Sequence, residues 1–144
     1  MRERNNTPTE HIEQTILFKW ASFVSADNVV CIDERIPKIM INGQQMSVID
    51  FLYAVPNGGK RSIKTAADLK AEGVKAGVPD ISLPYPTSKY HGLFIEMKRK
   101  QGGRVSDEQK IWLEYLNKVG YLAVVCKGYE QARELIEKYL KEEI

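Results

Sequence analysis

The first apolar pattern of the chain predicts an amphipathic helix that runs from Pro8 to about Ser25. Thr7 suits the N-cap, Pro8 the first helical position and Glu10 the third, which together form a capping box. At 100° per residue, one arc collects the large apolar side chains Ile12, Ile16, Leu17, Trp20, Phe23 and Val24. Glu13 falls inside that arc. A carboxylate there is unfavourable unless it is paired or bound to a metal, so we expect one of these two roles.

The remaining pattern alternates short apolar runs with helical segments. Strands are expected at Val29–Ile32, Met46–Ala54, Ile81–Leu83, Gly92–Lys98 and Tyr121–Cys126. Further helices are expected near Thr65–Glu72, from Ser106 to Val119, and over Tyr129–Glu142. This order of elements predicts an α/β fold with a mixed β-sheet flanked by α-helices, in a single domain that spans residues 1–144.

One apolar segment, Ile36–Met46, has two interpretations. The Asn42-Gly43 pair inside it is a strong turn signal, which favours a β-hairpin. The alternative is an arm that forms an interface with another molecule.

Charge is distributed unevenly along the chain. The total is only +2, but residues 57–104 contain ten Lys and Arg against four Asp and Glu. Such a segment is a candidate nucleic-acid surface, and the alternative is a solvated lysine-rich surface. The residues expected to contact phosphates are Lys60, Arg61, Lys64, Lys75, Arg99, Lys100 and Arg104.

Other features of the sequence indicate the cellular compartment. Cys31 and Cys126 lie in apolar runs and lack metal-ligand spacing, which predicts structural thiols in a reducing compartment. No run approaches the roughly 18 apolar residues of a membrane span, and no signal peptide is recognisable. We therefore expect a cytoplasmic protein with no membrane contact.

Asp80, Glu96 and Lys98 form the most informative pattern. Side chains alternate along a strand, so Glu96 and Lys98 project to one face while Ile95 projects to the other. A hairpin centred near Ser88 would place Asp80 opposite Glu96. Two carboxylates and a lysine would then meet at one point of the sheet.

That arrangement has a chemical interpretation. Paired carboxylates bind a hard cation such as Mg²⁺, or Mn²⁺, with a substrate phosphate completing the coordination shell. Lys98 would stabilise negative charge at the phosphorus centre or help to activate the attacking water. The structural alternatives are a surface Glu96–Lys98 pair and a turn role for Asp80. Gln109 fits the third position of a capping box that begins at Ser106, so a structural role for it competes with a catalytic one.

Three signatures occur in order along the chain: Gly73-x-x-x-Gly77-x-Pro79-Asp80, then Glu96-x-Lys98, then Gln109 at the start of a helix. Together they resemble the VRR-NUC domain, a branch of the PD-(D/E)xK nuclease superfamily. The same domain occurs at the C-terminus of the Fanconi-associated structure-specific nuclease. The resemblance extends from the helix that carries Glu13 to the last helix, and it implies a PD-(D/E)xK nuclease-like sheet.

The resemblance implies specific roles for the residues at the matching positions. Asp80 and Glu96 would bind the metal together with the backbone carbonyl of Met97. Glu13 would be an accessory acidic ligand, and Lys98 the catalytic lysine.

Two further positions and the substrate are also implied. Gln109 would orient groups in the site, and Asn57 would lie near the DNA. Stand-alone members of viral or phage type are similar small dimers that act on branched DNA, in the cytoplasm of a bacterial host. We therefore expect a metal-dependent endonuclease for branched DNA such as four-way junctions, with no organic cofactor. A nuclease for duplexes or flaps and a catalytically silent DNA-binding module are the alternatives.

Overall fold

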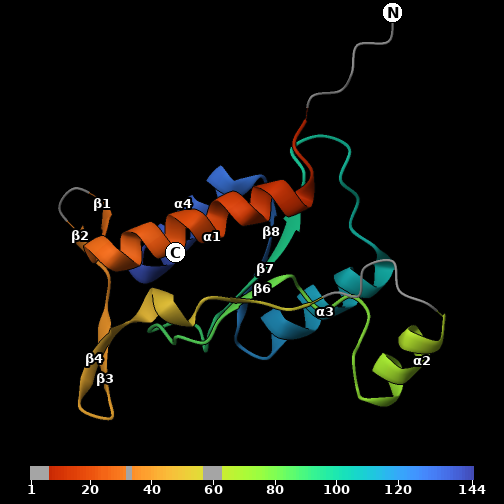
Figure 1. Cartoon of the computed structure of the whole chain (residues 1–144), viewed down its shortest axis with the longest axis horizontal. Helices are drawn as coiled ribbons and strands as arrows, with labels where there is room; N and C mark the ends of the chain where they lie inside the picture. Colours follow the sequence, from red (N-terminus) through yellow and green to blue (C-terminus); the bar gives the residue numbers. More distant parts are fainter. Residues whose placement is uncertain (1–6, 32–33, 57–62) are drawn as a thin grey trace, which may run out of the picture.

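The computed structural model describes residues 7–31, 34–56 and 63–144 (Figure 1). Its helices are α1 (Glu10–Asp27), α2 (Ile63–Ala71), α3 (Asp107–Lys118) and α4 (Tyr129–Leu140), with a 3-10 helix η1 (Val48–Phe51). Its strands are β1 (Val29–Cys31), β2 (Glu34–Arg35), β3 (Lys38–Ile41), β4 (Gln44–Ser47), β5 (Tyr53–Ala54), β6 (Ile81–Leu83), β7 (Leu93–Lys98) and β8 (Leu122–Lys127). None of the helices in these ranges is long and apolar enough to cross a membrane.

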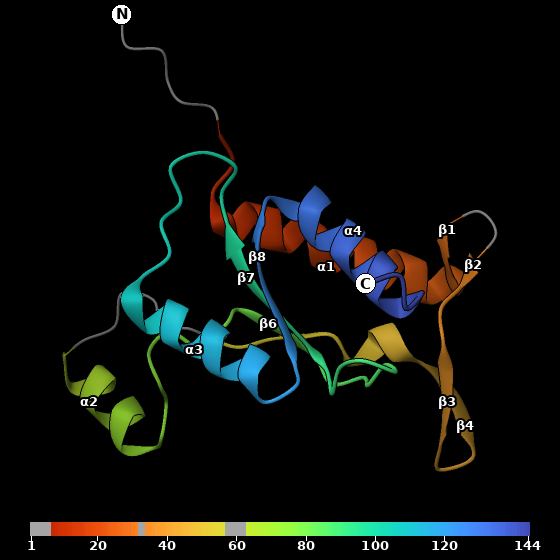
Figure 2. The same cartoon turned by 180° about the vertical axis from the view of Figure 1, so that it is seen from behind.

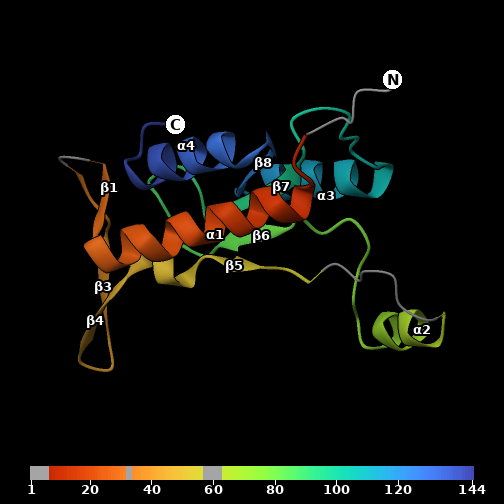
Figure 3. The same ribbon diagram turned by 45° about the horizontal axis from the view of Figure 1, so that its top comes forward.

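A four-stranded mixed sheet forms the centre of the molecule. Its strand order is β5-β6-β7-β8, and only the last pair is parallel. Helices α1 and α4 lie side by side over one face (Figure 3). Helix α3 connects β7 to β8 and packs against β8 from the opposite face (Figure 2). The α/β fold with helices flanking a mixed sheet is thereby confirmed.

The core lies between the sheet and the pair α1 and α4. Ile95 and Met97 of β7 are fully buried in it, while Glu96 and Lys98 alternate to the α3 face. Burying each large aliphatic side chain contributes about 1.5–3 kcal/mol, so this one-sided core holds β7 firmly in place. The other core residues include Leu17, Ala21, Val24, Ile81, Leu83, Leu93, Ala132, Ile136, Tyr139 and Leu140.

Helix α1 differs from its prediction in two respects. Its N-cap is Thr9, whose side chain accepts a hydrogen bond from the N–H of Ile12, so Thr7 precedes the helix. The buried stripe is Glu13, Leu17, Ala21 and Val24, whereas Phe23 of the expected arc is 66% exposed. The buried face is therefore rotated about the helix axis relative to the predicted apolar arc. A small residue such as Ala21 can lie in a helix contact, and its hydropathy alone does not predict that position.

The expected strand Met46–Ala54 is interrupted by η1. The Asp50 carboxylate accepts a hydrogen bond from the N–H of Ser47 at 3.2 Å and another from the Ser25 hydroxyl of α1. The bond to Ser47 offers the backbone a local alternative to the sheet ladder, and the bond to Ser25 ties this turn to α1. As a result β5 is short, and it forms the edge of the sheet beside α1.

The segment Ile36–Met46 forms a hairpin, as the turn signal predicts. Asn42 and Gly43 both have positive φ, at 49° and 79°, which matches the twist of a two-residue hairpin turn. The β3–β4 hairpin projects from the end of α1, away from the central sheet (Figure 1).

Cys126 is a buried free thiol of the core, and burial raises its pKa to about 12. The side chain of Cys31 lies outside the described residues.

Candidate active site

The register between β6 and β7 brings Asp80 to Glu96. Ile81 is paired with Ile95, so the preceding residue, Asp80, comes opposite Glu96. The Asp80 carbonyl accepts a hydrogen bond from the N–H of Val55 at 2.7 Å, which fixes its backbone to the segment after β5. Its Oδ2 atom accepts the N–H of Met97 at 2.8 Å. The predicted juxtaposition of the two carboxylates is therefore present in the structure.

Glu96 and Lys98 form a buried ion pair on the α3 face of β7. The Lys98 Nζ lies 2.8 Å from Glu96 Oε1, and the two residues are 5% and 1% exposed. Glu96 Oε2 is buried and accepts no hydrogen bond from any residue that the structure describes. This rules out the surface pair as an interpretation of the motif and leaves one carboxylate oxygen available to a ligand.

The environment shifts the pKa of both groups. Burial, assisted by the nearby charge of Asp80, raises the pKa of Glu96 from 4.5 to about 7 against the opposing effect of Lys98. Burial acts to lower the pKa of Lys98, but the hydrogen bond and charge of Glu96 outweigh it and raise that pKa above its ordinary value. Lys98 is therefore a fixed positive charge, while Glu96 is the carboxylate that resists ionisation.

Gln109 serves both as a helix cap and as a site residue. Its Oε1 accepts the N–H of Ser106 at 2.8 Å, and its own N–H donates to the Ser106 hydroxyl, which completes the capping box of α3. Its Nε2 donates to Glu96 Oε1 at 2.5 Å. The cap orients the amide, so one side chain both caps α3 and holds the carboxylate of Glu96.

Glu10 lies in the same site, and the sequence analysis did not assign it there. Its Oε1 lies 3.8 Å from Lys98 Nζ, and its side chain is about half exposed. The sequence pattern indicates for Glu10 only a position in a capping box. Only the three-dimensional structure brings Glu10 to Lys98, because α1 begins above the end of β7 (Figure 3).

These residues line an open cleft of about 660 Å³. Helix α2 and the segment that follows it form the outer wall, through Leu69, Lys70 and Val74, and Lys75 and Gly77 continue that wall. The inner wall carries the polar groups Glu10, Asp80, Glu96, Lys98 and Gln109.

Comparison with known proteins identifies the family. The model of the VRR-NUC domain family matches residues 30–130. The chain belongs to the VRR-NUC domain family. A solved structure described as a VRR_NUC domain protein is 29% identical, with a TM-score of 0.69, over 94% of this chain and 91% of that one. No curated protein matches the sequence. Membership of the VRR-NUC family indicates a nuclease domain.

Glu13 occupies a different place in this VRR-NUC domain from the one predicted. Its Oε2 accepts the N–H of Tyr129 at 2.8 Å, at the first turn of α4, and the residue is 1% exposed. A carboxylate at a helix N-terminus is stabilised by the helix dipole. Glu13 therefore links α1 to the first turn of α4, and its Oε1 accepts no hydrogen bond from the described residues. Glu10 is the α1 carboxylate that lies beside Lys98.

The predicted DNA-binding residues are divided among several locations. Lys75 lines the cleft, while Arg99 and Arg104 line a hollow of about 390 Å³ beside the start of α1. Lys100 points instead to α4, where it pairs with Glu130 at 2.9 Å and lies over the Tyr129 ring. Asn57, Lys60 and Arg61 lie outside the described residues, as does the side chain of Lys64 in α2.

Gly77 sets the approach of the segment before Asp80 to α3. Its φ is +83°, and a Cβ atom there would lie 2.6 Å from the backbone carbon of Glu108. Gly73 has a similar φ of +93° but open space around it. The two glycines of the family motif therefore have different requirements: both need a left-handed backbone, and only Gly77 needs close contact.

We predict that Gly77→Ala lowers the stability more than Gly73→Ala. Strain from positive φ alone is about 1–2 kcal/mol, which is the cost expected for Gly73→Ala. Gly77→Ala adds the clash with Glu108 and should cost at least about 1 kcal/mol more. Urea unfolding of the two variants measures the difference, and equal costs would contradict the close packing at Gly77.

We also predict that Glu13→Gln keeps nuclease activity while Glu13→Ala loses stability. Glutamine retains an oxygen that can accept the N–H of Tyr129, whereas alanine leaves this buried donor unpaired, at about 1–3 kcal/mol. Thermal unfolding and single-turnover cleavage measure the two effects. Loss of cleavage by a well-folded Glu13→Gln protein would instead assign Glu13 to the active site.

Proposed function

We propose that this VRR-NUC domain is a divalent-metal-dependent deoxyribonuclease that hydrolyses phosphodiester bonds in branched DNA. The observation that carries the proposal is the convergence of Asp80, Glu96 and Lys98 in one open cleft, with one buried oxygen of Glu96 accepting no hydrogen bond from the described residues.

The donor atoms at this point fit a hard divalent cation, Mg²⁺ or Mn²⁺. No three side chains of His, Cys, Asp or Glu gather into a metal cluster among residues 7–31, 34–56 and 63–144. Mg²⁺, however, is usually held by one or two carboxylates, with water and substrate phosphate as the other ligands. The carboxylates of Asp80 and Glu96 match that requirement.

A third ligand is available from the backbone of β7. The Met97 N–H points to Asp80, while the carbonyl of Lys98 accepts the N–H of Gly128 on the β8 side. The N–H and C=O of one strand residue point to the same side, so the Met97 carbonyl faces Asp80. When bound there, the cation would polarise the phosphate and lower the pKa of an attacking water.

The side chains of the chain then have distinct tasks. Lys98, held between Glu96 and Glu10, provides a fixed positive charge for the negative charge that develops on the phosphoryl oxygens. Gln109 positions Glu96 through its hydrogen bond, and the N–H of Ser106, which donates to Gln109 Oε1, keeps the amide from rotating. Glu10 is an accessory carboxylate on the open side of Lys98.

Features around the cleft support DNA as the substrate. Lys75, Arg99 and Arg104 stand on both sides of the acidic group and can contact phosphates, which provide affinity without base readout. We therefore assign selectivity to the shape of the DNA, with four-way junctions as the preferred substrate. A homodimer would present two clefts to a two-fold junction.

We expect wild-type protein with Mg²⁺ or Mn²⁺ to nick labelled four-way junctions faster than flaps or plain duplexes. Asp80→Asn removes a metal ligand and Lys98→Ala removes the fixed charge, so each should lower the cleavage rate at least about 100-fold. Lys138→Ala, on the exposed side of α4, is the matched control and should cut at the wild-type rate.

The same panel separates the alternatives. A faster rate on flaps or duplexes would replace the junction as the substrate, and cleavage without any divalent ion would contradict metal dependence. Folded protein that binds DNA but cuts none of the substrates with either ion would be a silent binding module. Light scattering on the same samples measures the oligomeric state, where a monomer would contradict the dimer.

A further inference from the structure

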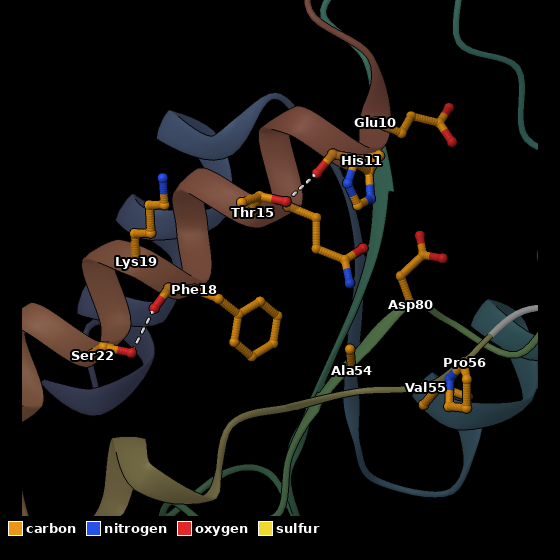
Figure 4. Close-up of a pocket in the computed structure, with 11 residues that line it drawn as sticks. Glu10, His11, Thr15, Phe18, Lys19, Ser22, Ala54, Val55, Pro56 and Asp80 are labelled. Atoms are coloured by element: carbon orange, nitrogen blue, oxygen red, sulfur yellow. Dashed lines mark hydrogen bonds between the residues drawn. The ribbon is translucent and has the colours of Figure 1, made fainter.

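A second hollow adjoins the active site on the other side of Glu10. It lies between α1 and the segment that follows β5, and its volume is about 780 Å³ (Figure 4). Asp80 and Glu10 form the end nearest the cleft, and Lys19 and Ser22 of α1 line the other end of the groove. Asp80 and Glu10 also line the cleft, so the two spaces adjoin at these residues.

This groove has an apolar floor and a polar rim. The floor contains Phe18 of α1 and, from the opposite wall, Ala54, Val55 and Pro56. Figure 4 shows the Phe18 ring directed from α1 across the groove toward Ala54. The rim carries polar side chains of α1, namely His11, Gln14, Thr15 and Lys19. Lys19 makes no ion pair with a described residue and is exposed.

We propose that this groove binds an unpaired nucleobase of the strand that is cut, with the Phe18 ring stacking against it. The inference rests on the proposed function and specifies which DNA the cleft takes. Single-stranded nucleic acid is bound by basic grooves in which aromatic side chains stack on bases. Phe18, which is partly buried against the core, supplies the ring, and His11 and Lys19 would contact the phosphates that flank the base.

The shape of the groove favours an unpaired base over a base pair. In a duplex each base is stacked on both faces and exposes only its edge in a groove of the helix. An aromatic ring can reach the face of a base only where the stack is interrupted, as it is at a branch point. The groove is also lined by two carboxylates, Glu10 and Asp80, beside His11 and Lys19, so it is poorly suited to a row of phosphates.

The spacing of Glu10 and Phe18 along α1 sets the distance between the stacked base and the scissile phosphate. Phe18 lies eight residues after Glu10, which corresponds to about 12 Å along a helix axis. A strand with B-DNA stacking advances about 3.4 Å per nucleotide, so the base on Phe18 lies about three or four nucleotides from the scissile phosphate. An extended strand would need fewer nucleotides to cover this distance.

The test is a double-mutant cycle, in which a Phe18 substitution is combined with the removal of a single base from the DNA. Anisotropy titrations in EDTA measure binding to splayed-arm DNA that carries one abasic site, moved through the first five unpaired positions. The proteins are wild type, Phe18→Leu, Phe18→Tyr and Phe23→Leu. Phe23 is the matched control, because it is a 66% exposed phenylalanine of the same helix and does not line the groove.

At one or two positions, removal of the base should weaken wild-type binding about tenfold. It should have no further effect on Phe18→Leu, while Phe18→Tyr and Phe23→Leu should behave as wild type. Such non-additivity identifies a direct contact between the ring and the base.

Additive effects at all five positions would overturn the proposal, as would the same loss in Phe23→Leu. If Lys19→Ala alone weakens binding and no abasic position matters, the groove holds only backbone phosphates, which equally contradicts base stacking. Cleavage by the wild-type protein with Mg²⁺ is scored separately, so a failure of the nuclease function is distinguished from a failure of this contact.

Discussion

The ion pair between Lys98 and Glu96, buried on the central strand β7, is the interaction on which the rest of the site depends. Burying two charges is unfavourable unless hydrogen bonds and good geometry compensate, and here the compensation is incomplete. Gln109 and Lys98 both bind Oε1 of Glu96, whereas Oε2 accepts no hydrogen bond from the described residues. The opposite face of the same strand, with Ile95 and Met97 in the core, provides the stability that keeps the pair in place.

Strand β7, with a buried apolar face and a charged face, also determines the positions of Asp80 and Gln109. The N–H of Met97, between the two charged residues, binds the carboxylate of Asp80 and aligns β6 with the site. Gly77 lets the segment before Asp80 pack closely against α3, and the cap of α3 directs Gln109 to Glu96.

The strand elements of the site could be predicted from the sequence, and the helix elements only in part. Side-chain alternation fixes which face Glu96 and Lys98 share, and the hairpin register then determines the partner of Asp80. Glu10 and Glu13 could not be distinguished in this way, because their roles depend on the rotation of α1 about its axis. That rotation is set by the packing of α1 against α4, which depends on tertiary contacts and not on periodicity.

Carbon NMR of the Glu96 carboxyl group tests most directly the proposal that a divalent cation compensates the charge of this buried side chain. Burial is the main cause that raises the pKa of Glu96 from 4.5 to about 7 in the metal-free protein. The contribution of protonated Glu96 to the free energy of unfolding is therefore complete below pH 4.5 and is lost as the pH rises through about 7. The measurement is the pH titration of the labelled Glu96 carboxyl carbon with and without Mg²⁺. We predict a midpoint near pH 7 without the ion and a clearly lower midpoint with it, because cation and proton compete for the same oxygens. A midpoint near 4.5 that Mg²⁺ leaves unchanged would contradict the account.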